Sequence, residues 1–120
     1  MPSDPDCPLV RIAELEIDPS RLARYRALLA EEIAASVRLE PGVLSLQATA
    51  LKHAPNQIRI LEVYASRAAY EAHLTTPHFL AYKHATADMV RSLRLIDTEP
   101  VAIFSKPLPQ SPARTPSSYS

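Results

Sequence analysis

Four side chains with catalytic chemistry lie close together in the middle of the chain. Glu62 and Tyr64 are two positions apart, so their side chains share one face of a predicted strand. His73 and His78 follow on predicted helix, near enough in the chain for His73 to border the same cavity as Glu62 and Tyr64. A histidine beside a carboxylate and a phenol can act as a general base near neutral pH, with the carboxylate fixing its tautomer. The alternative for His73 is a partly buried imidazole that only satisfies a backbone carbonyl group.

His78 falls in the first turn of a predicted helical segment that begins with Pro77 and is capped by Thr76. The positive end of the helix dipole disfavours a protonated imidazole there, so His78 is predicted to help His73 by accepting a proton or polarising an oxygen. The alternative is a surface histidine near a kink. Phe79 and Tyr82 are the candidate substrate-binding wall residues, although aromatic side chains at helical spacing also build cores.

The sequence predicts neither a metal site nor a cofactor. His84 lies six positions beyond His78, and the step from His73 to His78 crosses a proline, so helical spacing brings no histidine pair together. Cys7 is the sole cysteine, which excludes an internal disulfide and a thiolate site from one chain. Gly42 is the sole glycine, which excludes the glycine-rich loops that bind phosphates and dinucleotides.

Composition indicates one compact domain. The chain has 120 residues, of which 47% are hydrophobic and 22% are charged. Thirteen basic and thirteen acidic residues cancel, so no electrostatic field favours nucleic acid as a partner. The sequence has neither a signal-peptide pattern nor an apolar run of about 18 residues, so we expect no membrane association and a cytoplasmic location.

Hydrophobic periodicity predicts four strands and two helical regions. We expect the first helix to carry an inner stripe every three or four residues, and Gly42 to end it in a left-handed conformation. The predicted strands are 9–17, 43–52, 57–65 and 94–105. The helical regions run from Pro19 to Pro41 and from Ser66 past a break at 75–77. The inner stripe of the first helix is Leu22, Tyr25, Leu29, Ile33 and Val37.

This β-α-β-β-α-β order predicts an α+β, ferredoxin-like split βαβ fold, with an antiparallel four-stranded sheet and both helical regions on one face. The domain is predicted to span residues 8–105, after a flexible leader over 1–7 and before a disordered Pro/Ser-rich tail over 106–120. Strands 9–17 and 43–52 carry apolar residues on both faces. A solvated face is usually polar, so we expect a face-to-face homodimer.

Four segments resemble the antibiotic biosynthesis monooxygenase (ABM) domain family, over roughly residues 8–105. They are Glu62–Tyr64, Ala68–His73, Thr76–Phe79 and, upstream, Glu40–Val43. The resemblance implies a dimeric ferredoxin-like α/β barrel and a small cyclic or enolisable substrate. In many members it implies oxygenation without flavin, heme or metal, in which a base deprotonates a phenol or enol and the resulting anion reacts with oxygen. By motif position, His73 and His78 are the base and its helper.

The chain departs from parts of the family pattern. Anthrone-oxidising and heme-degrading members use a tryptophan and an asparagine, whereas this chain has no tryptophan and its only asparagine, Asn56, falls in a predicted hairpin. Tyr64 stands near the position of the tryptophan in the heme degraders, which argues against heme degradation. Three hypotheses remain: an oxidoreductase that oxygenates a quinol-like compound, an isomerase that uses the same base without oxygen, and a non-catalytic dimeric module that binds a small molecule.

Overall fold

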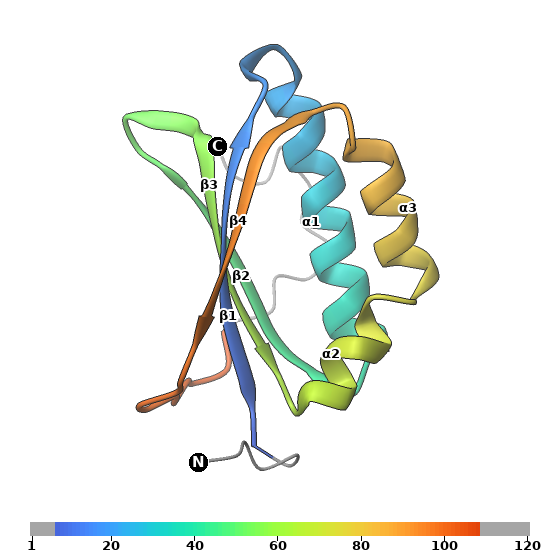
Figure 1. Ribbon diagram of the computed structural model, residues 1–120, viewed down its shortest axis with the longest axis vertical. Coiled ribbons are helices and arrows are strands. Elements are labelled where there is room, and N and C mark those ends of the chain that lie inside the picture. Colours follow the sequence, from blue (N-terminus) through green and yellow to red (C-terminus); the bar gives the residue numbers. More distant parts are fainter. Residues whose placement is uncertain (1–6, 109–120) are drawn as a thin grey trace.

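The computed structural model describes residues 7–108. Along the chain, strands and helices alternate in the predicted β-α-β-β-α-β order, with the second helical region divided in two (Figure 1). The elements are β1 (Leu9–Ile17), a short 3-10 helix (Pro19–Arg21), α1 (Leu22–Leu39), β2 (Val43–Leu51), β3 (Ala54–Tyr64), α2 (Arg67–His73), α3 (Pro77–Thr86) and β4 (Val90–Thr98).

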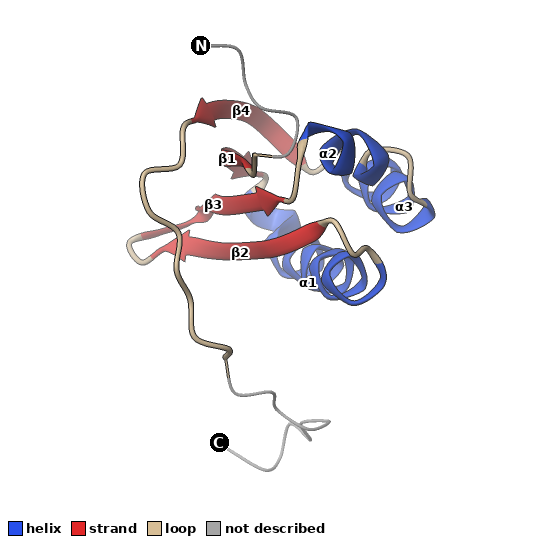
Figure 2. Ribbon diagram, turned by 90° about the horizontal axis from the view of Figure 1, so that it is seen from below, coloured by secondary structure: helices blue, strands red, loops and turns tan. Residues whose placement is uncertain are grey.

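The four strands form one antiparallel sheet in the order β2-β3-β1-β4, which confirms the predicted fold class. All three α-helices cover the same face of the sheet, and the other face carries none of them (Figure 2). β1 and β3 are the central strands, so side chains on their helix-facing sides lie between the sheet and the helices. β4 forms one edge of the sheet.

Local capping interactions set where the helices begin, and the cap predicted at Thr76 is confirmed. Asp18, Ser66 and Thr76 each accept a hydrogen bond from a backbone N–H two or three residues later. Proline follows Asp18 and Thr76 at the first helical position, where its missing N–H leaves no donor unsatisfied. The predicted break at 75–77 is confirmed as the boundary between α2 and α3.

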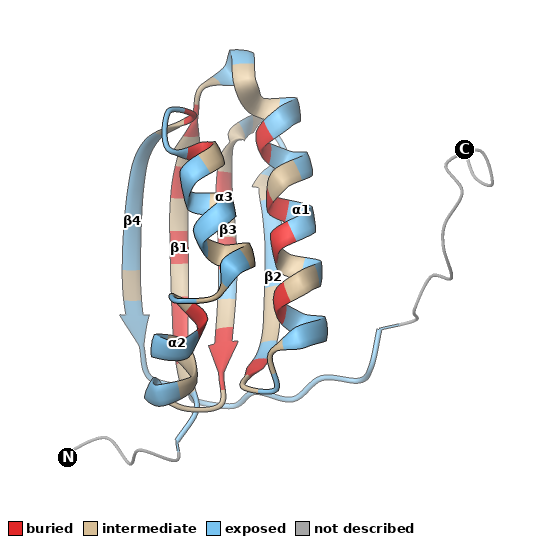
Figure 3. Ribbon diagram, turned by 90° about the vertical axis from the view of Figure 1, so that its right-hand side faces the viewer, coloured by how far each residue is buried: buried red, intermediate tan, exposed pale blue. Residues whose placement is uncertain are grey.

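The hydrophobic core lies toward the end of the sheet where β1 finishes. It combines the second half of β1 with the middle of β3, the first half of α1 and Met89 (Figure 3). Its buried members are Ala13, Leu15, Ile17, Tyr25, Leu29, Ile58, Ile60 and Met89. The other end of the space between sheet and helices is therefore available for polar side chains.

The inner face of α1 differs from the predicted stripe. Tyr25 and Leu29 are buried, but the stripe continues with Glu32 and Ser36, and Val37 is 46% exposed. In the second half of the helix, Glu32 and Ser36 therefore face inward beside Ile33, which packs against the core as predicted.

Gly42 does not take the left-handed conformation expected of it, since no described residue has a positive φ angle. Glycine is needed at this position for a steric reason, because a Cβ atom built at Gly42 would lie 2.5 Å from Cβ of Ala69 on α2. The turn between α1 and β2 therefore packs against α2 so closely that a side chain has no room.

The last strand starts at Val90, four residues before its predicted start at residue 94. β4 pairs with β1 from Val90 opposite Ile17 to Thr98 opposite Val10, so the ladder ends where β1 begins and the predicted strand residues beyond Thr98 have no partner. The chain after β4 instead crosses the side of the sheet opposite to the helices (Figure 2). β3 starts at Ala54, three residues earlier than predicted, and the β2–β3 hairpin is confirmed.

Most of the predicted leader and tail lies outside the described residues. Residue 7 and residues 106–108 are exposed and belong to no helix or strand. In the described part of the chain, no helix is both long and apolar enough to cross a membrane.

Candidate functional site

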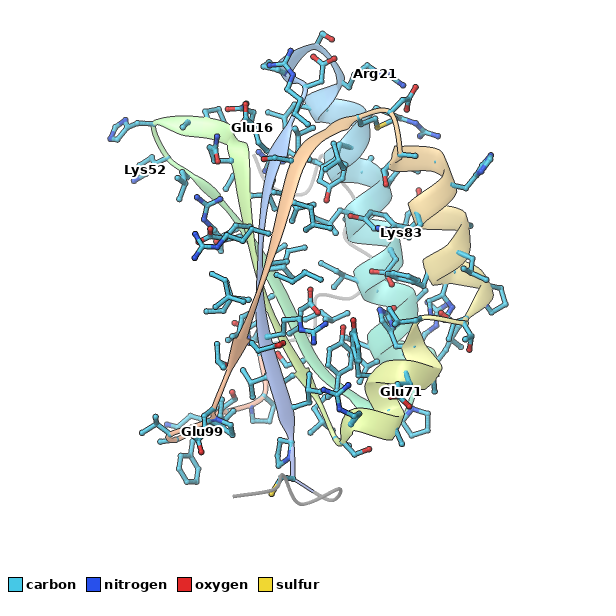
Figure 4. All side chains as sticks on the ribbon, in the orientation of Figure 1. Glu16, Arg21, Lys52, Glu71, Lys83 and Glu99 are labelled. Carbon is cyan, nitrogen blue, oxygen red and sulfur yellow. The ribbon has the colours of Figure 1, made fainter. Side chains whose placement is uncertain are left out.

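A cavity of about 670 Å³ lies between the sheet and the helices. Residues of β1, β3 and β4 line one side of it, and residues of α2 and α3 line the other. Figure 4 draws the side chains that lie between the sheet and the helices. Five of the six predicted site residues line this cavity, namely Glu62, Tyr64, His73, Phe79 and Tyr82. The volume is in the range of sites that bind small organic molecules.

The cavity opens along the β4 edge of the sheet. Leu93 and Leu95 line it from the helix-facing side of β4, where they pair with Leu15 and Ala13 of β1. They are nevertheless 45% and 49% exposed, and β4 is almost wholly exposed in Figure 3. A small molecule can therefore approach from this edge over an apolar surface.

His73 presents its two ring nitrogens to different surroundings. Nδ1 lies 3.0 Å from Oε2 and 3.3 Å from Oε1 of Glu40, within hydrogen-bonding distance. Nε2 lies 3.7 Å from Oε1 of Glu32, which is too far for a hydrogen bond, and it has no hydrogen-bond partner among the described residues. The ring is only 3% exposed and borders the cavity, so Glu40 orients it through Nδ1 while Nε2 stays available.

The carboxylate that orients His73 is therefore Glu40, whereas the sequence predicted Glu62 in this role. Glu62 is engaged on its own strand, where its Oε1 accepts a hydrogen bond of 2.9 Å from the hydroxyl of Tyr64. The ring centroids of Tyr64 and His73 are 5.4 Å apart, so those two residues pack without hydrogen bonding. Glu40 reaches His73 because it follows α1 directly and α2 docks beside that end of the helix.

His78 binds the same carboxylate, since its Nε2 lies 2.5 Å from Oε2 of Glu40. The spacing argument against a histidine pair is therefore wrong for His73 and His78. Helical periodicity does not apply between them, because α2 ends at His73 and α3 starts at Pro77. His78 is not among the residues that line the cavity, so it contacts the site only through Glu40.

The two carboxyl groups near His73 have opposite pKa shifts. Burial acts to raise the pKa of Glu40, but the hydrogen bonds with His78 and His73 outweigh it and hold that pKa below its ordinary value. Burial raises the pKa of Glu62 above its ordinary value, although the hydrogen bond from Tyr64 and the charge of Arg11 act in the other direction. A carboxylate with a raised pKa in an apolar cavity is suited to accept a proton.

Arg11 is a buried cation that lies opposite Glu62 on the neighbouring strand. Its Nε donates to Asp97 at 2.9 Å, and one terminal nitrogen donates to the hydroxyl of Tyr70 at 2.5 Å. The guanidinium carbon also lies 4.4 Å from the ring centroid of Tyr70. Arg11 is thus held rigidly where β1 borders the cavity.

Phe79 and Tyr82 form an aromatic wall. The ring centroid of Phe79 lies 4.8 Å from that of His73 and 6.3 Å from that of Tyr82. The hydroxyl of Tyr82 lies 2.6 Å from that of Tyr25 on α1, which fixes its orientation. A flat ring that enters the cavity would contact these aromatic side chains.

Sequence reasoning missed the polar residues that α1 contributes. Glu32 is 7% exposed, and its Oε1 accepts a hydrogen bond of 2.6 Å from Ser36. The only signal for Glu40 was its place in the upstream matching segment, and Glu32 and Ser36 gave none, because α1 is distant in the chain from the two histidines. Glu32, His73 and His78 also offer three donor atoms within 4.8 Å of one another, an arrangement that can hold a metal ion.

The chain is similar to known proteins over most of its length. A family profile described as antibiotic biosynthesis monooxygenase matches residues 8–85. A Bacteroides thetaiotaomicron protein provisionally named an antibiotic biosynthesis monooxygenase is 50% identical, with a TM-score of 0.81, over 88% of this chain and 100% of that one. Rv0793 from Mycobacterium tuberculosis is 26% identical, with a TM-score of 0.73, over 82% of this chain and 99% of that one.

A further solved structure shows the shared fold alone. PA3566 from Pseudomonas aeruginosa is 23% identical, with a TM-score of 0.74, over 83% of this chain and 100% of that one. No curated protein matches the chain.

Proposed function

Because this chain belongs to the antibiotic biosynthesis monooxygenase family, we propose that it oxygenates a quinol-like or other small enolisable compound, with His73 as the general base. One observation carries the proposal. Glu40 holds Nδ1 of His73 at 3.0 Å, while Nε2 has no hydrogen-bond partner among the described residues and belongs to a side chain that lines an open cavity. An imidazole oriented in this way can take a proton from a bound hydroxyl group.

The proposed reaction starts with proton transfer from a phenol or enol of the substrate to Nε2 of His73. Glu40 keeps the ring in place and Glu32, 3.7 Å from Nε2, favours the imidazolium that forms. The substrate anion then adds dioxygen at a ring carbon that bears hydrogen, and the hydroperoxide so formed loses water to leave a carbonyl group. The substrate supplies all four electrons, so a quinol and O₂ give a hydroxyquinone and water. No resident cofactor is needed in this scheme.

The other candidate residues have distinct proposed roles. His78 positions the base indirectly, because it holds Glu40 and does not line the cavity. Glu62 and Tyr64 form a hydrogen-bonded pair that can bind a second oxygen of the substrate or accept a second proton. Phe79 and Tyr82 bind the flat body of the substrate through their rings.

An oxygen electrode and a panel of quinols test this proposal. We expect oxygen uptake by the wild-type protein, and a loss of about 100-fold or more in kcat for His73→Asn, which is the usual contribution of a general base. His84→Ala is the matched control, because His84 is exposed on α3 and should leave the rate unchanged. A panel in which no quinol gives oxygen uptake that depends on His73 would remove the support for this function.

The second candidate is an isomerase, and the pair of proton acceptors favours it. Glu62 and His73 both line the cavity, and each is suited to move a proton, so the substrate can lose a proton to one and regain it from the other. Turnover that persists without oxygen and requires both residues would support isomerisation. If His73→Asn lowers stability and no substrate reacts, the remaining hypothesis is a non-catalytic binding module.

We further propose a homodimer formed through the sheet face that the helices leave uncovered. Ile12 and Ile96 of neighbouring strands lie on that face, and both are partly buried, while Leu61 is 36% exposed there. The chain after β4 crosses the same side and exposes Val101 and Phe104 at 99% and 93%. Large apolar side chains with this exposure are typical of a surface that a second copy covers.

A further inference from the structure

The two buried carboxylates beside His73 have no basic side chain to neutralise them. Glu32 is 7% exposed and the side chain of Glu40 is 12% exposed. Among the described residues, the only ion-pair partners of either carboxylate are His73 and His78. Because an isolated buried charge is strongly unfavourable, a cation bound here would compensate these carboxylates.

The gap between His73 and Glu32 fits a single ion. Nε2 and Oε1 face each other at 3.7 Å without a hydrogen bond. Bonds of about 2.0 to 2.2 Å from a zinc-like ion to nitrogen and oxygen span at most about 4.4 Å across the ion, so one ion can bridge this separation at an open angle. His78 supplies a third donor atom, and all three donor atoms lie within 4.8 Å of one another.

The donor types suit a divalent transition metal. Two imidazoles and one carboxylate are ligands that zinc, iron, cobalt and nickel accept, and they leave positions open for water or substrate. Neighbouring residues already orient the ligands: Ser36 donates to Glu32 at 2.6 Å, and Glu40 holds Nδ1 of His73 at 3.0 Å. Since His73 has two ring nitrogens, Nε2 can bind the ion while Nδ1 keeps Glu40.

We propose that Glu32, His73 and His78 bind one divalent transition-metal ion beside the cavity, which only His73 of the three lines. The ligands come from α1, from the last residue of α2 and from the first turn of α3, so the ion would join three helices. Metal binding engages Nε2 of His73 and therefore excludes its use as a base. This last consequence rests on the proposed function, whereas the metal site does not.

Cobalt is the probe, because its absorption spectrum reports both binding and coordination geometry. The full chain, first treated with a chelator, is titrated with Co²⁺ at neutral pH. We expect one ion per chain with visible absorption typical of a low-coordinate nitrogen and oxygen site. Glu32→Gln and His78→Asn should each weaken binding by about tenfold or more. Loss of a residue that only orients a ligand already costs about this much, and loss of the ligand itself costs at least as much.

Matched controls separate the site from general surface binding. Glu31→Gln changes the exposed neighbour of Glu32 on α1, and His84→Ala removes an exposed imidazole from α3, so both should bind Co²⁺ like the wild type. Thermal unfolding of each apoprotein shows whether the variants fold. The proposal is overturned if folded wild-type protein binds no Co²⁺, or if Glu32→Gln and His78→Asn bind it as tightly as the controls.

The metal site and the proposed function fail in different ways. If the protein binds Co²⁺ through these ligands but oxidises no quinol, the metal-site proposal stands and the proposed function is contradicted. If the protein oxidises quinols in the presence of a chelator and saturating Zn²⁺ has no effect, the proposed function stands and the metal-site proposal is contradicted. Zn²⁺ inhibition that Glu32→Gln relieves, and Glu31→Gln does not, is the expected result.

Discussion

Oε2 of Glu40 lies 3.0 Å from Nδ1 of His73, although the two residues are 33 positions apart in the chain. Glu40 follows α1, and His73 is the last residue of α2, so this hydrogen bond exists only when the two helices dock on the sheet. His78 binds the same oxygen from the first turn of α3. The orientation of the candidate base therefore depends on the packing of three helices, and one carboxylate joins them.

Replacing Glu40 should impair both activity and acid-dependent stability. The pKa of Glu40 in the folded protein is below its ordinary value of 4.5, so its carboxylate stabilises the fold above pH 4.5, and this contribution is lost as pH falls through the lower folded-state pKa. Glu40→Gln should lower the free energy of unfolding at pH 7 by about 1 to 3 kcal/mol, because two hydrogen bonds with imidazoles are weakened. Urea unfolding at pH values from 3 to 7 measures the effect.

The control for Glu40→Gln is Glu31→Gln, which removes an exposed carboxylate from α1. It should leave both the stability at pH 7 and its decline in acid unchanged. If Glu40→Gln instead declines in acid as steeply as the wild type, Glu40 does not carry the predicted stabilisation.

The features that the sequence predicts correctly are local. Asp18, Ser66 and Thr76 cap helices because each side chain bonds a backbone N–H within three residues, and such contacts are visible in the sequence. The alternation of apolar and polar residues along a strand is also local, so it predicts the element order and the fold class. His73 is brought to the same cavity as Glu62 and Tyr64 because all three lie around one strand-to-helix connection.

The features that the sequence does not predict depend on distant partners. Glu40 and Glu32 face His73 only after α1 packs beside α2. No local sequence pattern predicts this packing. β4 ends at Thr98 because β1 offers no further partner, although the apolar alternation of the chain continues. Gly42 is needed because Ala69 is close in space, which a sequence position next to a proline does not reveal.

Adding a methyl group at Gly42 should destabilise the docking of α2. A Cβ at this position meets Cβ of Ala69 at 2.5 Å, a separation that requires the helix or the turn to shift. We expect Gly42→Ala to lower the free energy of unfolding by about 1 to 3 kcal/mol, as overpacking does in other cores. Chemical denaturation measures the change.

The double variant Gly42→Ala with Ala69→Gly tests the cause of that loss. It removes the contacting Cβ, so it should regain part of the stability, less the roughly 1 kcal/mol that glycine costs in a helix. Ala69→Gly alone supplies that reference value. If the double variant is no more stable than the sum of the single changes predicts, the contact with Ala69 is not the reason for Gly42.

A charge on the uncovered sheet face should separate the proposed dimer. Leu61 lies on that face and is 36% exposed, so Leu61→Glu places a carboxylate in the proposed interface and should give a monomer in light scattering at micromolar concentration. Leu80→Glu is the control, because Leu80 is 53% exposed on α3 and should leave the assembly unchanged. A wild-type protein that is monomeric at the same concentration contradicts the dimer.

Neutralising Glu62 should stabilise the fold at neutral pH. Burial raises the pKa of this carboxyl above its ordinary value of 4.5, so the folded protein binds the proton more tightly than the unfolded chain. Stability contributed by the protonated form is complete below pH 4.5 and is lost as pH rises through the folded-state pKa. Glu62→Gln keeps an oxygen that can accept the hydrogen bond from Tyr64 and removes the buried charge. Its unfolding midpoint should therefore exceed that of the wild type at pH 7 and match it near pH 4. A lower midpoint at pH 7 would show that Arg11 and His73 stabilise the ionised carboxylate more than burial opposes it.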